Sequence, residues 1–440
     1  MTKRFITAAF SLCLLLSPAG ASAQWFLFPG SRPQSDTLTV ISKEAKDEGG
    51  AARRPGNSGS GNTSHSGTGL QDDSGSGSLS FGAAVPDSSP VRNEEADTTG
   101  LPYRWGQHRN DFENALKVSL ILPFRTSGTP NSNFLDFYSG ALLAADRLAS
   151  AGSRISLRVF DSAEGLPGAG VLQESDLIIG PVSCDDILPA LALAGGKFIV
   201  SPLDPKAAEF TSRHNLIQAP SGWEAQVDGM VQWLAADLTE GESVILLQSD
   251  SEAGGEITGR MALRLADAGI PYEISSAPFP EEGGRAAGTS FVIASENDEF
   301  CCNCIREIAI ANLQGGDYSV YSTSRLRALQ DLETESLHAA RAHITASYYA
   351  DQANPLVQAF ARDYKRLFKA EPGQWAYQGY DLMYYFGRRM TEDPQDWPIF
   401  LPDHPANGLQ TDFRFDGSGR NNTAVRKLRY DPANTITIIR

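Results

Sequence analysis

The sequence predicts an α/β protein with two lobes, each built on a mainly parallel sheet that is flanked by helices. Short apolar runs of strand length alternate with longer segments whose apolar residues recur at helical spacing, and this alternation is typical of parallel sheets. After about residue 221 a second series of the same kind begins without repeating the first sequence. The chain has 440 residues, of which 41% are hydrophobic, so it can form two or three folding units.

The first series of elements lies between residues 117 and 202. Its strands are apolar or alternating runs that stop at proline or a small polar residue, and its helices carry apolar residues three or four positions apart. We expect strands at 117–124, 154–163, 176–181 and 197–202, and helices at 134–152 and 187–194.

The second series follows the same rules and is longer. It ends in two helices and in a closing segment, 411–440, that reads as a hairpin with a Gly/Asn turn followed by one more strand. The expected helices are 223–238, 256–268, 304–313, 355–368 and 377–390, and the expected strands are 242–250, 270–276, 289–297, 317–324 and 343–351.

The first residues have the pattern of a secretory signal peptide. Lys3 and Arg4 precede an apolar stretch, 5–16, and Ala21-Ser22-Ala23 forms a small-x-small cleavage site. The apolar stretch falls short of the ~20 residues that span a bilayer, and no later stretch is long and apolar enough to be a transmembrane span. We therefore expect residues 1–23 to be removed and the protein to be exported to the periplasm.

The remaining chain divides by composition. Residues 24–115 form an N-terminal segment whose part from 44 to 100 is rich in Gly, Ser, Asp, Asn and Pro, a composition typical of a flexible tether. Residues 116–440 form the two-lobed domain. We expect lobe 1 at about 116–220 plus 345–395 and lobe 2 at about 221–344 plus 396–440.

Composition and motifs argue against several classes of function. A net charge of -16 argues against a nucleic-acid partner. The chain has no Gly-x-Ser-x-Gly elbow, Walker loop, His-Glu-x-x-His helix or dinucleotide glycine motif after a strand, so we expect no enzyme activity and no cofactor. Cys301, Cys302 and Cys304 are too crowded for a zinc site, and with Cys184 they are either disulfide-bonded or buried thiols.

Two strand ends carry the strongest functional signal. The segment 176–204, DLIIGPVSCDDILPALALAGGKFIVSPLD, contains two short strands that each end at small polar residues and proline. In open α/β sheets, ligands bind at the carboxyl ends of parallel strands. The segment therefore predicts one wall of a small-molecule pocket.

Several stretches resemble the type 1 periplasmic binding protein family, which includes leucine- and branched-chain amino-acid-binding proteins. The resemblance covers residues 116–439 and is nearest to lipoprotein-like members, some of which are fused to LysM repeats. No LysM repeat is present here, because the tether occupies that region. The stretches are DLIIGPVS (176–183), FIVSPLDP (198–205), QAPSGWEAQVDGMVQWL (218–234), NPLVQAFARDYKRLFKAEP (354–372) and WAYQGYDLMYYF (375–386).

The resemblance implies a ligand site in a cleft between the lobes. In lobe 1, the residues that would hold the carboxylate and ammonium groups of a ligand are Ser183 and the segment Ser201 to Leu203. Ser183 and Ser201 could equally cap the turns that follow them. In lobe 2, the strand ends that would face the ligand carry Ser249, Asp250, Ser295, Glu296 and Ser322.

Two hypotheses of function follow. The first is a binding protein that closes on a small polar ligand, with an amino acid as the first candidate, for a membrane transporter or for sensing. The second is a protein-interaction module of the cell envelope without ligand transport, for example a regulator of wall synthesis. The tether favours the second hypothesis, because it would allow the domain to reach a partner.

Overall fold

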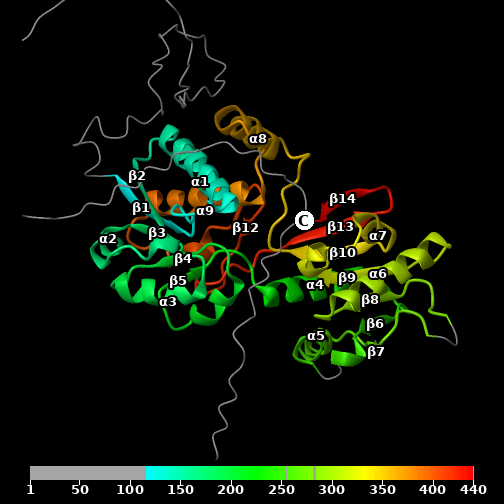
Figure 1. Cartoon of the computed structure of the whole chain (residues 1–440). Coiled ribbons are helices and arrows are strands. Elements are labelled where there is room, and N and C mark those ends of the chain that lie inside the picture. The colour runs from blue at the N-terminus through cyan, green and yellow to red at the C-terminus, as the bar shows by residue number, and fades with distance from the viewer. Residues whose placement is uncertain (1–114, 253–254, 281–283, 440) are drawn as a thin grey trace, which may run out of the picture.

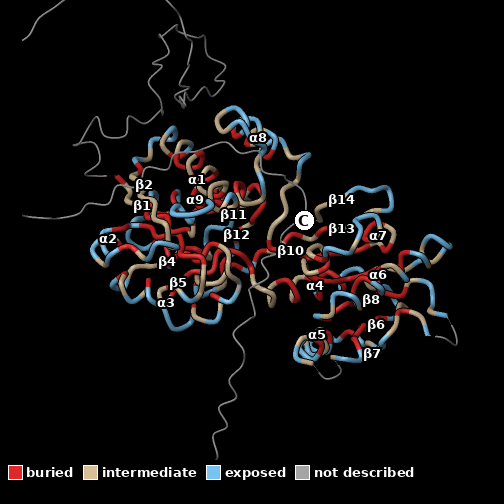
Figure 2. Tube along the Cα trace, viewed as in Figure 1, coloured by how far each residue is buried: buried red, intermediate tan, exposed pale blue. Residues whose placement is uncertain are grey.

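The fold is the predicted one: two mainly parallel sheets, each covered by helices on both faces. The computed structural model describes residues 115–252, 255–280 and 284–439. The expected signal peptide and tether lie outside the described residues. The two sheets occupy separate halves of the molecule (Figure 1), and buried residues concentrate along the strands of each sheet (Figure 2).

The first sheet has five parallel strands in the order β2-β1-β3-β4-β5. Successive residues of β1 point to opposite faces, so that Leu120 packs towards α1 and α9 while Ile121 packs towards α2 and α3. The elements of this half are β1 (Leu116–Leu122), α1 (Ser132–Ser150), β2 (Ile155–Asp161), α2 (Ala169–Glu174), β3 (Leu177–Ile179), α3 (Cys184–Leu193), β4 (Ile199–Ser201) and β5 (Leu216–Gln218).

The second sheet has seven strands in the order β14-β13-β10-β9-β8-β6-β7, and only its β13 and β14 pairings are antiparallel. Helices α4 and α5 pack on one face, and α6 and α7 pack on the other. The elements are α4 (Trp223–Asp237), β6 (Val244–Leu247), α5 (Glu256–Asp267), β7 (Glu273–Ser275), β8 (Ser290–Ile293), α6 (Asp298–Leu313), β9 (Ser319–Thr323), α7 (Thr334–Ala339), β10 (Ala342–Ala346), β13 (Arg426–Asp431) and β14 (Thr435–Ile439).

Between β10 and β13 the chain returns to the first sheet. Helices α8 (Pro355–Phe368) and α9 (Gln374–Glu392) pack on α1, and β11 (Ala406–Asn407) pairs with β12 (Asp412–Phe413). The chain thus passes between the sheets three times: after β5, after β10 and before β13. Phe415 still packs in the core of the first sheet, so the third crossing comes later than the sequence-based boundary near residue 396.

The closing segment contains one strand more than expected. Phe415 and Asn422 form an antiparallel bridge around a turn with Gly419 at φ +70°, which corresponds to the expected hairpin. Two strands follow it, β13 and β14, joined through Asn434 at φ +57°.

Two buried charged groups fasten the crossing segments. Arg426, at the start of β13, forms a salt bridge with Asp412 at 2.6 Å and also donates to the carbonyl oxygens of Gly408 and Tyr349. Tyr349 belongs to the second crossing, whereas Gly408 and Asp412 precede the third. Asp381 of α9 accepts hydrogen bonds from the backbone N–H groups of residues 409, 410 and 411.

The four described cysteines are free thiols, and three of them are core residues of the second half. Cys301, Cys302 and Cys304 lie on α6, which packs on the sheet. The sequence left open whether these cysteines form disulfides or stay as thiols, and in the structure they are thiols. In the described ranges, no group of His, Cys, Asp and Glu side chains could hold a metal ion, and no helix is long and apolar enough to cross a membrane.

Candidate binding surfaces at the strand ends

The turn after β3 places Ser183 directly before the first residue of α3, in the N-cap position. Gly180 has φ +89°, and a Cβ atom there would lie 2.0 Å from the carbonyl oxygen of Ile121, so only glycine fits this turn. Ser183 then caps α3, because its Oγ accepts a hydrogen bond from the N–H of Asp185 at 3.2 Å. The half-buried Ser183 hydroxyl is thus engaged in capping, and its contact with a ligand stays a prediction.

Ser201 lies at the end of β4, next to Ser183 in the order of strands, and is fully buried. Its Oγ makes no hydrogen bond within the described residues. The same holds for Oε1 of Gln218, the residue that pairs with Ser201 on β5, and for Oγ of Ser221. The carboxyl ends of β4 and β5 therefore hold three buried oxygen atoms without partners. Leu203, in contrast, packs against the core of the first sheet.

Segments from distant parts of the chain lie over these strand ends. Nε2 of Gln378, on α9, donates to the carbonyl oxygen of Pro202 at 3.3 Å. Nδ2 of Asn422, just before the third crossing, donates to the carbonyl oxygen of Ala219 at 2.7 Å. The N–H of Gln218 donates to the carbonyl oxygen of Arg420 at 2.7 Å. The unpartnered oxygens thus lie where α9 and the third crossing meet the first sheet.

Three predicted residues of the second half, Ser249, Ser295 and Glu296, bond to Glu252, which the sequence analysis did not single out. Oε2 of Glu252 accepts from the Ser295 hydroxyl at 2.5 Å, and its Oε1 accepts from the N–H of Glu296 at 2.8 Å. Ser249 and Asp250 lie in the same turn, where the Ser249 hydroxyl is 2.8 Å from the hydroxyl of Ser251. The available signal for Glu252 was an acidic residue in the turn after β6, close to Ser249 and Asp250 in sequence.

Ser322, at the end region of β9, donates its hydroxyl to the carbonyl oxygen of Ile293 on β8 at 3.0 Å. The hydroxyls of Ser249, Ser295 and Ser322 therefore all have partners within the second half. Across the described part of the chain, no hydrogen bond or ion pair joins these residues to Ser183, Ser201 or Leu203. The structure brings the candidates together as two groups, one on each sheet.

Acidic groups surround the start of α3. Asp185 and Asp186 lie in its first turn, and burial together with the nearby Asp185 raises the pKa of Asp186. Burial and the neighbouring Asp204 raise the pKa of the Cys184 thiol to about 12, so this thiol stays protonated at neutral pH. The electrostatic surroundings of Ser183 thus favour a cationic group over a carboxylate.

Two mainly parallel sheets flanked by helices and joined by three crossings, with candidate residues at the strand ends of each sheet, are the architecture of a two-lobed binding protein. The sequence profile of the family described as "Periplasmic binding protein" matches residues 117–392, and the chain belongs to this family. The comparison with curated proteins gives no match.

Solved structures share the fold at low sequence identity. A putative branched-chain amino acid ABC transporter from Rhodospirillum rubrum is 16% identical, with 74% of this chain and 100% of that chain covered and a TM-score of 0.53. The C-domain of LpoA from Haemophilus influenzae, a regulator of PBP1A, is 14% identical, with the same 74% of this chain and 100% of that chain covered and a TM-score of 0.47. At 16% identity, the match to the Rhodospirillum rubrum protein shows a common fold alone.

Proposed function

We propose that this protein is an exported, non-enzymatic binding protein of the periplasm that holds a small polar ligand between its two lobes, for a membrane transporter or for sensing. Amino acids are the first candidates. Membership of the periplasmic binding protein family supports the proposal, and export rests on the signal-peptide pattern of residues 1–23. The observation that carries it is the set of unpartnered oxygens on Ser201, Gln218 and Ser221.

These oxygens have an energetic cost that a ligand would remove. A buried polar group without a hydrogen bond costs about 1–3 kcal/mol. An ammonium group has three N–H donors, which match the two hydroxyl oxygens and one amide oxygen in number and in polarity. Because Gln378 and Asn422 cover the strand ends, the ligand would enter when α9 or the third crossing moves.

Thermal-shift measurements on residues 24–440 with the twenty amino acids test this proposal. We expect at least one amino acid to raise the Tm, by an amount that grows with ligand concentration. Ser201→Ala should raise the Tm of the unliganded protein, because it removes a buried hydroxyl that has no partner, and should lose the ligand-induced shift.

The matched control is Ser119→Ala on β1. The Ser119 hydroxyl is buried 2.8 Å from the hydroxyl of Ser175, away from the strand ends. Its loss should lower the Tm of the free protein and leave the ligand-induced shift intact. A shift that survives Ser201→Ala and Gln218→Ala together would place the ligand elsewhere and refute the assignment of the site.

A second candidate function is a protein-interaction module of the cell envelope without ligand transport. One observation favours it: the hydroxyls of Ser249, Ser295 and Ser322, predicted to face a ligand, are already hydrogen-bonded within the chain. The same panel separates the two functions. Stabilisation by an amino acid would rule out the interaction-only function, and a broad panel without any stabilisation would rule out the first.

A further inference from the structure

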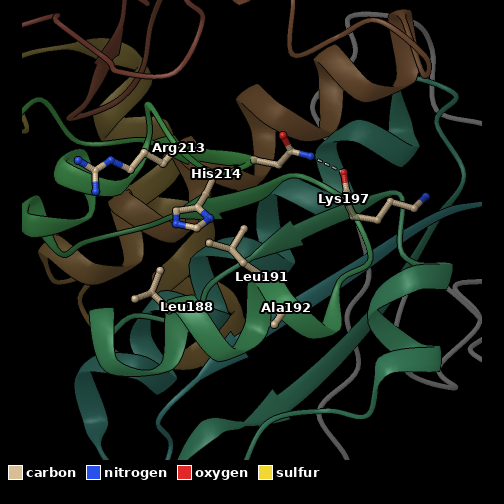
Figure 3. Close-up of a pocket in the computed structure, with 8 residues that line it drawn as sticks. Leu188, Leu191, Ala192, Lys197, Arg213 and His214 are labelled. Carbon is tan, nitrogen blue, oxygen red and sulfur yellow. Dashed lines mark hydrogen bonds between the residues drawn. The ribbon is translucent and has the colours of Figure 1, made fainter.

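Two surface features of the described residues lie outside the candidate site: a pocket beside α3 and the β14 edge of the second sheet. The pocket, of about 340 Å³, lies between α3 and the loops that lead into β4 and β5 (Figure 3). Lys197 and Arg213 line it, but in Figure 3 these side chains point away from each other. Leu191, which also lines it, packs against the core of the first sheet. The edge of the second sheet is therefore the stronger interaction surface.

Strand β14 is the last strand of the second sheet, and its outer edge has no partner among the described residues (Figure 1). In its antiparallel ladder with β13, alternate residues bond to β13, so the N–H and C=O groups of the intervening residues point outward. No hydrogen bond joins these outward groups to another described residue. A row of unpaired backbone groups at a sheet edge is a template for a further strand.

The side chains of β14 also favour a further strand. Residues 435–439 are Thr-Ile-Thr-Ile-Ile, so every residue is β-branched and none is charged. Thr435 is exposed, and the other four residues are half-buried. Ile436 and Ile438 pack against the core of the second half on one side only. A neighbouring strand would cover the apolar surface that these isoleucines still expose.

The other edges of the two sheets are protected. Strand β2 carries Arg158 at its centre, with Glu174 at 3.6 Å. The outer edge of β5 is occupied at Gln218, which forms a parallel bridge with Asn421. Strand β7 has only three residues, the first of which is Glu273. Charged side chains, coverage by other segments and short strands keep sheet edges from pairing. Strand β14 has none of these protections within the described residues.

From these features we propose that the edge of β14 is an interaction surface for a second copy of this chain, and that the two β14 strands pair antiparallel about a two-fold axis at Thr437. In this register Ile436 of one copy lies opposite Ile438 of the other, on the face that α6 and α7 cover, so apolar side chains meet. Thr437 meets its own copy without any charge. The same arrangement at β2 would place Arg158 opposite itself, which explains why β14 is the edge that pairs.

The paired strands form one continuous sheet through the second halves of both copies. The interface involves the second half alone, so it is independent of the proposed ligand at Ser201. Five residues a side is few beside the about 20–30 residues of a standard interface, so we expect a weak dimer with a Kd on the order of 10–100 μM.

Sedimentation velocity of residues 24–440 measures this association. The weight-average sedimentation coefficient should rise from the monomer value to the dimer value as the protein concentration passes from well below to well above the expected Kd. A coefficient that stays at the monomer value over the whole range would overturn the proposal.

Charges placed at the two-fold axis test the register. Thr437→Lys and Thr437→Glu should each raise the Kd by about 10-fold or more, because each variant places like charges opposite each other. An equimolar mixture of the two should regain the dimer, because a lysine then faces a glutamate. Thr437→Val removes the hydroxyl that donates to Asp431 at 2.6 Å but adds no charge, so it should leave the Kd unchanged. Circular dichroism of each variant checks that the fold is retained.

Ile274→Lys is the matched control. It adds the same charge to β7, at the opposite edge of the second sheet, where Ile274 is 53% exposed, and it should leave the Kd unchanged. Equal weakening by Ile274→Lys and Thr437→Lys would show an effect of net charge alone. A mixture of Thr437→Lys and Thr437→Glu that stays monomeric would show that β14 does not pair with its own copy. Either result would overturn the proposal.

Discussion

Gly379→Ala is expected to destabilise the first half of the molecule, because α1 and α9 approach each other through glycine. A Cβ atom at Gly379 would lie 1.9 Å from the carbonyl oxygen of Phe137, and one at Gly140 would lie 1.9 Å from the carbonyl oxygen of Ala376. Both clashing groups are backbone, so the helices themselves must move apart. Overpacking of this kind lowers the free energy of unfolding by about 1–3 kcal/mol. Because the contact is so close, we expect a cost near the upper end of this range, about 3 kcal/mol.

The net effect is smaller because alanine is the better helix former by about 1 kcal/mol. We therefore expect Gly379→Ala to lower the free energy of unfolding by about 2 kcal/mol. Gly259→Ala is the control: Gly259 is an exposed residue of α5, and its Cβ would meet nothing within 4 Å. The free energy of unfolding of Gly259→Ala should be about 1 kcal/mol higher than that of the unchanged protein.

Urea unfolding followed by circular dichroism measures both variants, provided that their m values agree with that of the unchanged protein. The difference of about 3 kcal/mol between them isolates the clash from helix propensity. If Gly379→Ala is as stable as Gly259→Ala, the contact between α1 and α9 is not as close as described, and the reasoning fails.

Two further predictions concern the buried charges that fasten the crossing segments. Burial raises the pKa of Asp381 to about 6. The folded protein therefore binds a proton more tightly than the unfolded chain, and this contribution to stability, about 3 kcal/mol below pH 4, is lost as the pH rises through 6. The urea midpoint of the unchanged protein should therefore fall between pH 4 and 8, and the midpoint of Asp381→Asn should not show this fall. If the midpoint of Asp381→Asn falls with pH as steeply as that of the unchanged protein, the assignment to Asp381 is contradicted. Arg426→Met should lower the free energy of unfolding by about 3–5 kcal/mol, because it leaves the largely buried Asp412 unpaired, and Arg426→Met/Asp412→Leu should recover most of the loss in the same assay. A double variant as unstable as the single one would show that the other bonds of Arg426 matter more than the salt bridge.

Long periodic segments were predictable from the sequence, whereas some of the short ones were missed. The helix at 355–368 has the predicted bounds, because Asn354 caps it and its apolar spacing is regular. The three-residue β5 and the six-residue α2 and α7 were missed, since so few residues give no period. Helix α6 begins at Asp298, not at 304, because Asn297 caps it by accepting from the N–H of Phe300.

The candidate site was predictable only in its location on the strand ends. Whether a serine there faces a ligand or bonds within the chain depends on residues that are distant in sequence. Ser295 finds its partner in Glu252, and no local pattern around Ser295 indicates that bond. The unpartnered state of Ser201 likewise depends on how α9 and the third crossing cover β4.

The unpartnered oxygens and the crossing segments share one residue, Gln218. Its side-chain Oε1 lacks a partner, while its backbone N–H and carbonyl oxygen bond to Arg420 and Asn422 ahead of the third crossing. That crossing ends at Arg426, which also holds Tyr349 of the second crossing. A group that bonds to Gln218 Oε1 therefore acts on a residue that is linked through the backbone to two of the three connections between the sheets. The proposed ligand at this position would thus bond to a residue that is connected, through hydrogen bonds and the chain between Asn422 and Arg426, to the segments that join the two halves, and this connection is how the proposed binding would act on their relative movement.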